Sequence, residues 1–368
     1  MKNLKAKFRA FFHLEPDVWH LALSMSMLSF ASGLVSPFVS VLLRDLGASF
    51  LDVGKVASGY NLALAITAFL GGSLCAKFGG KSVFISSLLF SLFAILSYTT
   101  AVGAVNWLLI ALGLLFSRVA WGLRDTASFS VVAKSAEESR KATAFGLLST
   151  LQYLGAAIGP VLSGVLAYYF GMTFLFFLSI PIISAAIVII LLRMEKGEIT
   201  SKRVFPSRNE IKNAFATEKS IMVLVVLAFC GQFFSEFGNP YRFIFMQEVL
   251  LAPDYLLPLP QTAITISSLL VGIPSGYLSD KARKRKLFIV LGSLIATAGV
   301  GFNAFAVSPL MLIVTFFLFG LSNIISWTCL QAYFSDVGGT QGAFNSRRIF
   351  SFTMDWRNIF ASHIGIRC

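Results

Sequence analysis

Charged residues are scarce in this chain. Only 13% of its 368 residues are Asp, Glu, Lys or Arg, whereas soluble domains contain about 25%. A soluble fold of this composition would expose far more apolar surface than monomeric soluble proteins tolerate. The shortage of charge therefore argues against a soluble protein and favours one that lies in a membrane.

Cysteine and histidine are also sparse, with four and three residues. The cysteines form no metal-binding pair or disulfide framework, and we interpret them as buried, inert thiols. They are Cys75, Cys230, Cys329 and Cys368. The phosphate-binding motif of ATP-driven pumps and the Gly-x-Ser-x-Gly nucleophile motif are both missing from the sequence. These absences argue against an enzyme, and we expect no cofactor or metal.

Long apolar runs dominate what is present. Hydrophobic residues make up 56% of the chain, and its mean hydropathy is +0.78. About 20 apolar residues cross the hydrocarbon core as a helix, and continuous runs favour helices over alternating strands. We predict an all-α polytopic membrane protein with ten transmembrane helices. They cover about 18–43, 52–75, 83–103, 107–131, 144–169, 172–193, 220–248, 258–279, 287–306 and 309–334.

The net charge of +13 is distributed unevenly among the loops. Of the Lys and Arg residues, 21 lie in the segments 1–16, 76–82, 133–143, 193–219 and 280–286. The alternate loops contain only Arg44 and Lys55. This positive-inside pattern predicts a multi-pass plasma-membrane protein whose N-terminus is cytoplasmic. Topology and contact with anionic lipid headgroups then explain the basic excess, and we expect no nucleic-acid partner.

The chain repeats itself with an offset of 204 residues. The offset places the first apolar segment on 222–247 and the fourth on 311–335. Two tandem membrane halves are the construction of secondary transporters. We therefore expect a small-molecule substrate and a coupling ion.

The repeat also predicts the domain boundaries. Residues 1–193 form an N-terminal six-helix half, 194–219 a cytoplasmic linker, and 220–336 a C-terminal half with four spans. Residues 337–368 are an aberrant polar tail, in which charged residues interrupt every apolar stretch. We expect that spans 11 and 12 are missing through a truncation or frame change, with a genuine ten-span protein as the alternative.

Two loops resemble a signature of the major facilitator superfamily, in which Gly is followed by an acid and basic residues. The first copy has Gly72, Lys77, Gly79 and Lys81, with Ala76 at the place of the acid. The second copy has Gly276, Asp280, Lys281, Arg283 and Arg285. The resemblance implies that the acid acts as a latch at a helix N-terminus of the opposite half, where the helix dipole favours a carboxylate.

The fifth span resembles the antiporter signature of the same family. The matching residues are Gly146, Gly155, Gly159, Pro160, Ser163 and Gly164. Small residues four apart let two helix backbones approach, and Pro160 bends the helix. The resemblance implies a seal between the two halves that favours exchange; ordinary small-residue packing is the alternative.

The fourth span resembles the family in the pair Arg118 and Gly122, which implies a buried arginine linked to proton coupling. Arg118 lies near the middle of its span. A charge there costs at least ~2.5–3.5 kcal/mol, so we expect it to face a cavity or a partner. A structural hydrogen bond to backbone carbonyls is the alternative.

Spans 1, 4, 7 and 10 line the central cavity in this family, and here all four have polar residues at helical spacing. Span 1 has Ser29, Ser32, Ser36 and Ser40; span 4 has Arg118, Trp121 and Asp125; span 7 has Gln232, Glu236 and Asn239; span 10 has Asn323, Trp327 and Gln331. Pro240 is expected to interrupt span 7 just before Arg242.

Glu236 is the candidate proton-coupling carboxylate, with a salt bridge to Arg242 or Arg118 as the alternative. Asp125 is either part of the polar stripe or an interfacial charge beside Arg124. Trp121 and Trp327 fit a flat or cationic ligand, while Arg118 and Arg242 fit an anion.

The residues and the resemblance together predict a monomeric secondary transporter that exports a small molecule in exchange for protons or another coupling ion. An uptake permease or facilitator is one alternative. A truncated membrane protein without transport activity is the other.

Overall fold

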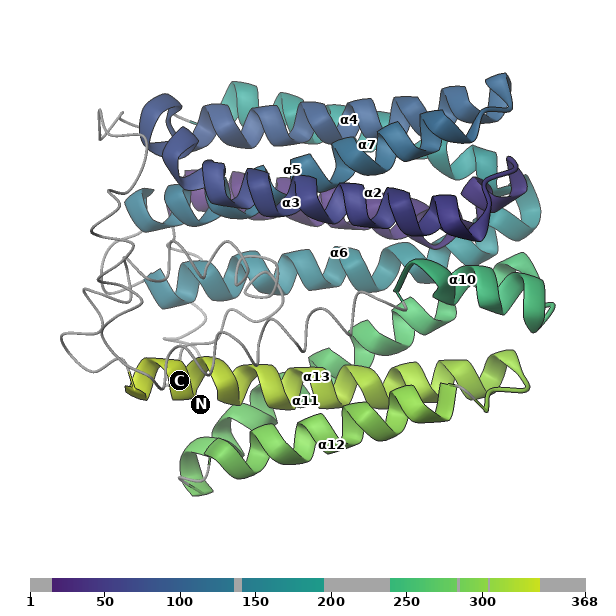
Figure 1. Ribbon diagram of the computed structural model, residues 1–368. Coiled ribbons are helices and arrows are strands. Elements are labelled where there is room, and N and C mark those ends of the chain that lie inside the picture. Colours follow the sequence, from purple (N-terminus) through teal and green to yellow (C-terminus); the bar gives the residue numbers. More distant parts are fainter. Residues whose placement is uncertain (1–14, 136–140, 195–238, 283–284, 304, 338–368) are drawn as a thin grey trace.

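The computed structural model describes residues 15–135, 141–194, 239–282, 285–303 and 305–337, and all regular structure in these ranges is helical (Figure 1). The first half contains α2 (Pro16–Asp45), α3 (Phe50–Phe78), α4 (Gly80–Ala104), α5 (Trp107–Ser135), α6 (Lys141–Phe170) and α7 (Met172–Arg193). The second half contains η2 (Asn239–Tyr241), α10 (Arg242–Ile244), η3 (Phe245–Val249), η4 (Asp254–Leu256), α11 (Leu259–Ala282), α12 (Arg285–Asn303) and α13 (Pro309–Val337).

Among the described residues, six helices are long and apolar enough to cross a membrane, namely α2 to α7. They confirm the six spans predicted for the first half. The helices α11, α12 and α13 coincide with the predicted eighth, ninth and tenth spans. Most of the predicted seventh span, residues 220–238, and the predicted tail, 338–368, lie outside the described residues.

Local chemistry explains where the helices begin and end. Ser49 and Asp52 form a reciprocal capping box, with both hydrogen bonds 3.2 Å long, and thereby start α3. Gly79 alone separates α3 from α4 and has a φ of 83°, in the region that side chains disfavour. These short connections reverse the direction of the chain between successive apolar helices.

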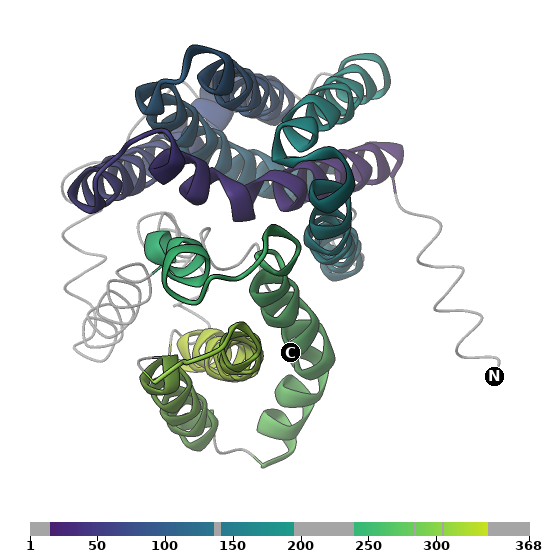
Figure 2. The ribbon, with the colours of Figure 1, turned by 90° about the vertical axis from the view of Figure 1, so that its right-hand side faces the viewer.

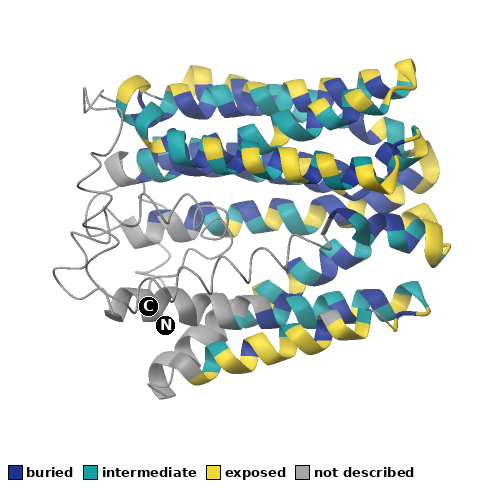
Figure 3. Cartoon of the chain, viewed as in Figure 1, coloured by how far each residue is buried: buried dark blue, intermediate teal, exposed yellow. Residues whose placement is uncertain are grey.

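The first half is built around α2. This helix packs on α5, α6 and α7, while α4 packs on α5 and α7, and α3 packs on α5. In the apolar, membrane-spanning segment of α2, 67% is buried inside the protein, compared with 22–44% in the corresponding segments of the other five spans. Fully buried side chains along it include Leu21, Leu28 and Phe38. The apolar core therefore surrounds α2, as the burial pattern shows (Figure 3).

The outer helix faces are apolar as well. Leu62, Phe93 and Leu192 expose 63%, 50% and 77% of their surface. Exposure of this kind is unfavourable in water but not in lipid, whose tails solvate apolar side chains. Hydroxyl groups in the helices mostly bond back to their own backbone, as Thr67 does to the Ala63 oxygen at 2.7 Å.

The two halves form separate groups of helices when the bundle is viewed end on (Figure 2). They meet where α6 contacts α11 and η4, where α10 contacts α2, and where η2 contacts α3. These contacts place α11 beside the first half and leave a cavity between them.

Candidate functional site

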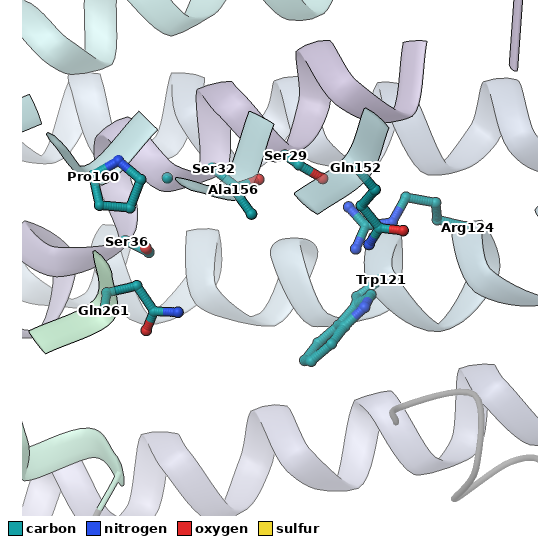
Figure 4. A pocket seen from close by; sticks show the side chains of 10 residues that line it. Ser29, Ser32, Ser36, Trp121, Arg124, Gln152, Ala156, Pro160 and Gln261 are labelled. Carbon is teal, nitrogen blue, oxygen red and sulfur yellow. The ribbon is translucent and has the colours of Figure 1, made fainter. Parts of the chain in front are cut away.

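A cavity of about 150 Å³ lies between three helices of the first half and one helix of the second. Its described lining residues come from α2, α5, α6 and α11. They are Ser29, Ser32, Gly33, Ser36, Trp121, Arg124, Gln152, Ala156, Pro160 and Gln261. Gln261 lies at one end of the cavity, and Arg124 and Trp121 lie at the other (Figure 4). Pockets of this kind, between helices of a bundle and with a few convergent polar groups, are the usual ligand sites.

The wall that α2 contributes contains serines of the predicted stripe. Three of the four serines, Ser29, Ser32 and Ser36, line the cavity. Helical spacing of 3 and 4 residues places them on one face. The stripe is thus a wet face of this helix, and the expectation for span 1 agrees with the geometry.

The wall from α5 differs from the expected one. Trp121 lines the cavity as expected, but the cation beside it is Arg124. Arg118 is not among the lining residues: its guanidinium lies 4.6 Å from the ring centre of Tyr60 and 5.1 Å from that of Trp121. Contact with an aromatic ring stabilises a cation, so Arg118 has aromatic partners on α3 and α5 and does not line this cavity.

Asp125 is buried, with 3% of its surface exposed. Its Oδ1 lies 3.6 Å from Arg124 Nε. The alternative that Asp125 is only an interfacial charge does not fit this burial. Removing two charges from water costs free energy, which their mutual attraction offsets only in part, and pairs at this depth are typical of functional positions.

The wall from α11 consists of Gln261, which the sequence analysis did not identify. Arg242 donates a hydrogen bond from Nη2 to Gln261 Oε1 at 2.5 Å. The guanidinium of Arg242 also stacks on Phe243, 4.4 Å from its ring centre. Arg242 therefore acts on the cavity through the glutamine that it orients.

Two further lining residues, Gln152 and Arg124, had weak signals in the sequence. Gln152 is 7% exposed and interrupts an otherwise apolar stretch of α6. Arg124 stands out in the sequence only as the neighbour of Asp125. Polar residues inside apolar spans are such signals, but their spacing alone does not tell which cavity they reach.

The predicted break in span 7 is present. Asn239, Pro240 and Tyr241 form a 3₁₀ turn, followed by one turn of α-helix and a π-helical turn. Proline removes a backbone donor and disrupts the regular helix here. Gln232 and Glu236 lie outside the described residues, and the side chains of Asn239, Asn323 and Trp327 are not described. Their roles remain predictions.

In the first signature loop, Gly79 forms the turn, and a Cβ at Gly72 would meet nothing within 4 Å. Lys81 Nζ donates to the backbone oxygens of Leu191, at 3.3 Å, and Met194. A cation at a helix C-terminus satisfies its free carbonyls and complements the dipole, so Lys81 ties this loop to the end of α7.

In the second signature loop, Gly276, Asp280 and Lys281 belong to α11, but their side chains are not described, and Arg283 lies outside the described residues. The proposed latch therefore stays a prediction.

The span-5 motif packs closely, but mostly within the first half. A Cβ at Gly159 would lie 2.6 Å from the Phe30 oxygen and 3.0 Å from Gly33 Cα, and one at Gly155 would collide with the Ser26 oxygen. All three neighbours belong to α2. Only Gly164 approaches the second half, where a Cβ would lie 2.6 Å from the Tyr255 oxygen. The lack of side chains at Gly155 and Gly159 thus lets α6 approach α2, and the implied seal between the halves stays a prediction. Gly146 lies in α6, with its surroundings not described.

The halves are bridged at the end of the bundle where α2 finishes. Arg44 donates from Nε and Nη2 to the two carboxylate oxygens of Glu248, at 2.8 and 3.3 Å. Tyr241 donates from its hydroxyl to the Phe50 oxygen at 3.0 Å. The rings of Tyr168 and Tyr255 meet edge to face, 5.9 Å apart. These contacts link the halves beside the cavity at one end of the molecule.

Comparison with known proteins agrees with this architecture. The sequence is 26% identical over 336 residues to a multi-drug resistance efflux pump PmrA homolog of Lactococcus lactis, covering 89% of this chain and 80% of that protein. It is 26% identical over 189 residues to the quinolone resistance protein NorA of Staphylococcus aureus, covering 51% of this chain and 48% of NorA.

Solved structures give the same fold. The nucleoside transporter NupG has a TM-score of 0.66 at 11% identity, covering 94% of this chain and 89% of its own. The human organic anion transporter MFSD10 has a TM-score of 0.60 at 11% identity, covering 95% of both chains. The profile of the Major Facilitator Superfamily matches residues 21–352. The chain thus belongs to the Major Facilitator Superfamily, a family of multi-pass membrane transporters and not of enzymes.

Proposed function

We propose that this transporter exports a small organic molecule across the plasma membrane in exchange for protons, with the cavity between α2, α5, α6 and α11 as its binding site. The observation that carries the proposal is the position of this cavity. It has walls from both halves, so a rocking motion of one half against the other would open it to either side in turn. The contacts around Arg44 and Tyr241 would close one side.

Export is supported by the span-5 signature and by relatives that are named as efflux and resistance proteins, although at only 26% identity. Exchange for protons is supported by a buried carboxylate, Asp125, beside the cavity residue Arg124. Glu236, which lies outside the described residues, is the second candidate from the sequence. A carboxylate in a dry site binds and releases a proton according to the charges near it, which is what coupling requires.

Reconstituted vesicles with a pH-sensitive dye inside test this function. A panel of a quinolone and small aromatic cations, neutral compounds and anions is added with and without a pH gradient. We expect at least one compound to accumulate against its own gradient while protons move the opposite way, and a protonophore to abolish the accumulation. Movement of every compound only down its own gradient, with no proton flux, would instead indicate a facilitator.

Asp125→Asn separates coupling from binding. We expect this variant to retain exchange of substrate for substrate and to lose accumulation driven by the pH gradient. Glu15→Gln is the matched control, because Glu15 is an exposed carboxylate before the start of α2. Unchanged gradient-driven transport by Asp125→Asn would remove Asp125 from the coupling proposal.

A further inference from the structure

The charged wall of the cavity suggests which molecules it accepts. Arg124 is the one formally charged residue among the described lining residues. Its side chain is only 12% exposed. A buried guanidinium is expensive unless acceptors surround it.

Two hydrogen-bond donors of this wall are without acceptors among the described residues. Arg124 Nε and Trp121 Nε1 are both buried and have no hydrogen-bond partner in the described part of the chain. The contact between Arg124 Nε and Asp125 Oδ1, at 3.6 Å, is too long for a hydrogen bond. Buried donors without partners are rare in native proteins, and each requires an explanation. Two of them at one end of one cavity point to a ligand with acceptor atoms there.

The opposite end of the cavity also offers a donor. Because Gln261 Oε1 accepts the hydrogen bond from Arg242, the amide nitrogen of Gln261 is left for the cavity, and Figure 4 shows it directed toward the other end. The amide nitrogen can act there as a hydrogen-bond donor.

The second layer around the cavity is positive as well. Arg118 stacks on Trp121 and Arg242 bonds to Gln261, so each end has an arginine behind it. Among the described residues in contact with these groups, Asp125 supplies the opposing charge. Charges this close to a cavity inside the protein act more strongly on a ligand than they would in water, since the effective dielectric constant is lower.

The size of the cavity limits the ligand. An engineered protein cavity of about 150 Å³ is known to hold benzene. This cavity has a similar volume and an indole at its wall. Aromatic side chains favour offset or edge contacts with another ring.

We propose that the cavity selects organic anions, and that it binds the benzoate-sized aromatic carboxylate part of the transported molecule. The carboxylate accepts hydrogen bonds from Arg124 and from the indole of Trp121, and its ring packs beside Trp121. Arginine suits this role because its planar donors match the geometry of a carboxylate. The inference rests on the proposed transport function, and it makes Arg124 the residue that determines charge selectivity.

Three probes of similar size and different charge test the inference. Benzoate, benzamide and benzylamine are titrated into the purified full chain in lipid nanodiscs, and binding is measured by calorimetry. We expect benzoate to bind at least about tenfold more tightly than benzamide, as a hydrogen bond to a charged group implies, and benzylamine to bind most weakly.

Substitutions at the two donors localise the selectivity. Arg124→Gln is expected to remove the preference for benzoate over benzamide, and Arg124→Lys to retain part of it. Trp121→Phe keeps the ring and removes one donor, so benzoate affinity should fall a few-fold. Arg193→Gln is the matched control, because Arg193 is an exposed arginine at the end of α7. Thermal unfolding of each variant shows whether it is folded. If Arg124→Gln does not fold, the benzoate affinities of Trp121→Phe and Arg124→Lys test the inference instead.

Equal affinity for benzoate and benzamide in the unchanged protein, or no benzoate binding, would overturn the inference. So would a benzoate preference that survives in Arg124→Gln. These results are distinct from failure of the proposed function. Proton-linked movement of cationic or neutral compounds without benzoate selectivity would support the transport function and overturn the anion site. Selective benzoate binding without any proton-linked flux would support the anion site and overturn the proton-linked transport function.

Discussion

At the scale of single residues, two arginines of α5 lie six positions apart and have different surroundings. Arg124 lines the cavity beside Asp125, whereas Arg118 is held between the rings of Tyr60 and Trp121. Each aromatic contact stabilises a desolvated cation by about 1–2 kcal/mol. Arg118 therefore connects α3 with the indole at the cavity wall, and a change at Arg118 reaches the ligand through Trp121.

The prediction at this scale concerns Arg118. We expect Arg118→Ala to lose transport driven by a pH gradient, because the indole of Trp121 loses the cation that stacks on it. Arg118→Lys should retain part of the transport, since a positive charge remains without the planar shape. Uptake into reconstituted vesicles with an imposed pH gradient measures both variants.

Tyr60→Leu provides the comparison for Arg118. It removes one of the two rings and keeps the charge, so transport should persist while the free energy of unfolding falls by about 1 kcal/mol. Full gradient-driven transport by Arg118→Ala would show that this arginine is structural only.

At the scale of elements, the contact between α2 and α6 sets the shape of the cavity. Gly33 on α2 faces Gly159 and Pro160 on α6, and a Cβ at Gly33 would lie 2.7 Å from Pro160 Cδ. Gly33 and Pro160 both line the cavity, beside the serine stripe. The close approach of the two backbones thus shapes one wall of the cavity.

The prediction at this scale is that bulk at this contact separates the helices. We expect Gly159→Leu to lower the free energy of unfolding by at least about 1–3 kcal/mol, as overpacking of a filled site does. We also expect it to slow exchange of substrate, because Pro160 and Gly33 move. Thermal unfolding in detergent and counterflow in vesicles measure the two effects.

Gly59→Ala is the matched control for Gly159→Leu. Gly59 lies in the middle of α3, and a Cβ there would meet nothing within 4 Å. Alanine favours the helix at such a position by up to about 1 kcal/mol, so stability should stay equal or rise. A Gly159→Leu protein as stable and as active as this control would contradict the close-contact account.

At the scale of the whole molecule, the two halves are joined at symmetric positions. Arg44 and Glu248 are 204 residues apart, which is the offset of the tandem repeat. The same position in each half therefore provides the two partners. In a transporter whose halves are related by an axis along the membrane normal, equivalent positions near that axis face each other. The ion pair thus links the ends of the first and seventh spans.

The prediction at this scale concerns opening at that end. A pair this exposed is worth up to about 1 kcal/mol, so Arg44→Glu or Glu248→Arg should open the bridged end a few times more often. Combining the two reversals should restore the pair. The opening is measured with Ser36→Cys in a chain whose four native cysteines are replaced by serine. Because Ser36 lines the cavity, the rate at which an impermeant thiol reagent labels this cysteine increases with the opening.

The same experiment depends on the side of the membrane to which the reagent is added. The charge distribution predicts that the α2 C-terminus is external, so the reagent is added outside intact cells. Lys55→Glu is the control, since Lys55 pairs with Asp52 in its own helix, at 3.4 Å, and not across the halves. Equal labelling of the single reversals, the double reversal and the control would show that the pair does not hold this end closed.

The sequence predicted the elements well and the site only in part. The six first-half spans, the break at Pro240 and the wet serine face of α2 follow from patterns that act locally: apolar length, proline chemistry and helical spacing. Arg118 and Arg124 show why the site follows only in part. Both are cations inside one span, and their surroundings depend on residues of other helices, such as Tyr60 of α3 beside Arg118.

The sequence by itself determined the class of protein, the helices and the tandem halves, because the hydrophobic thickness of a membrane imposes lengths that can be counted. The tertiary structure decided which helices touch. It placed Gly155 and Gly159 against α2, Gly164 against the second half, and Gln261 opposite Trp121. Such contacts join residues that are far apart in the sequence, and they depend on packing between surfaces that have no periodic signature in the chain.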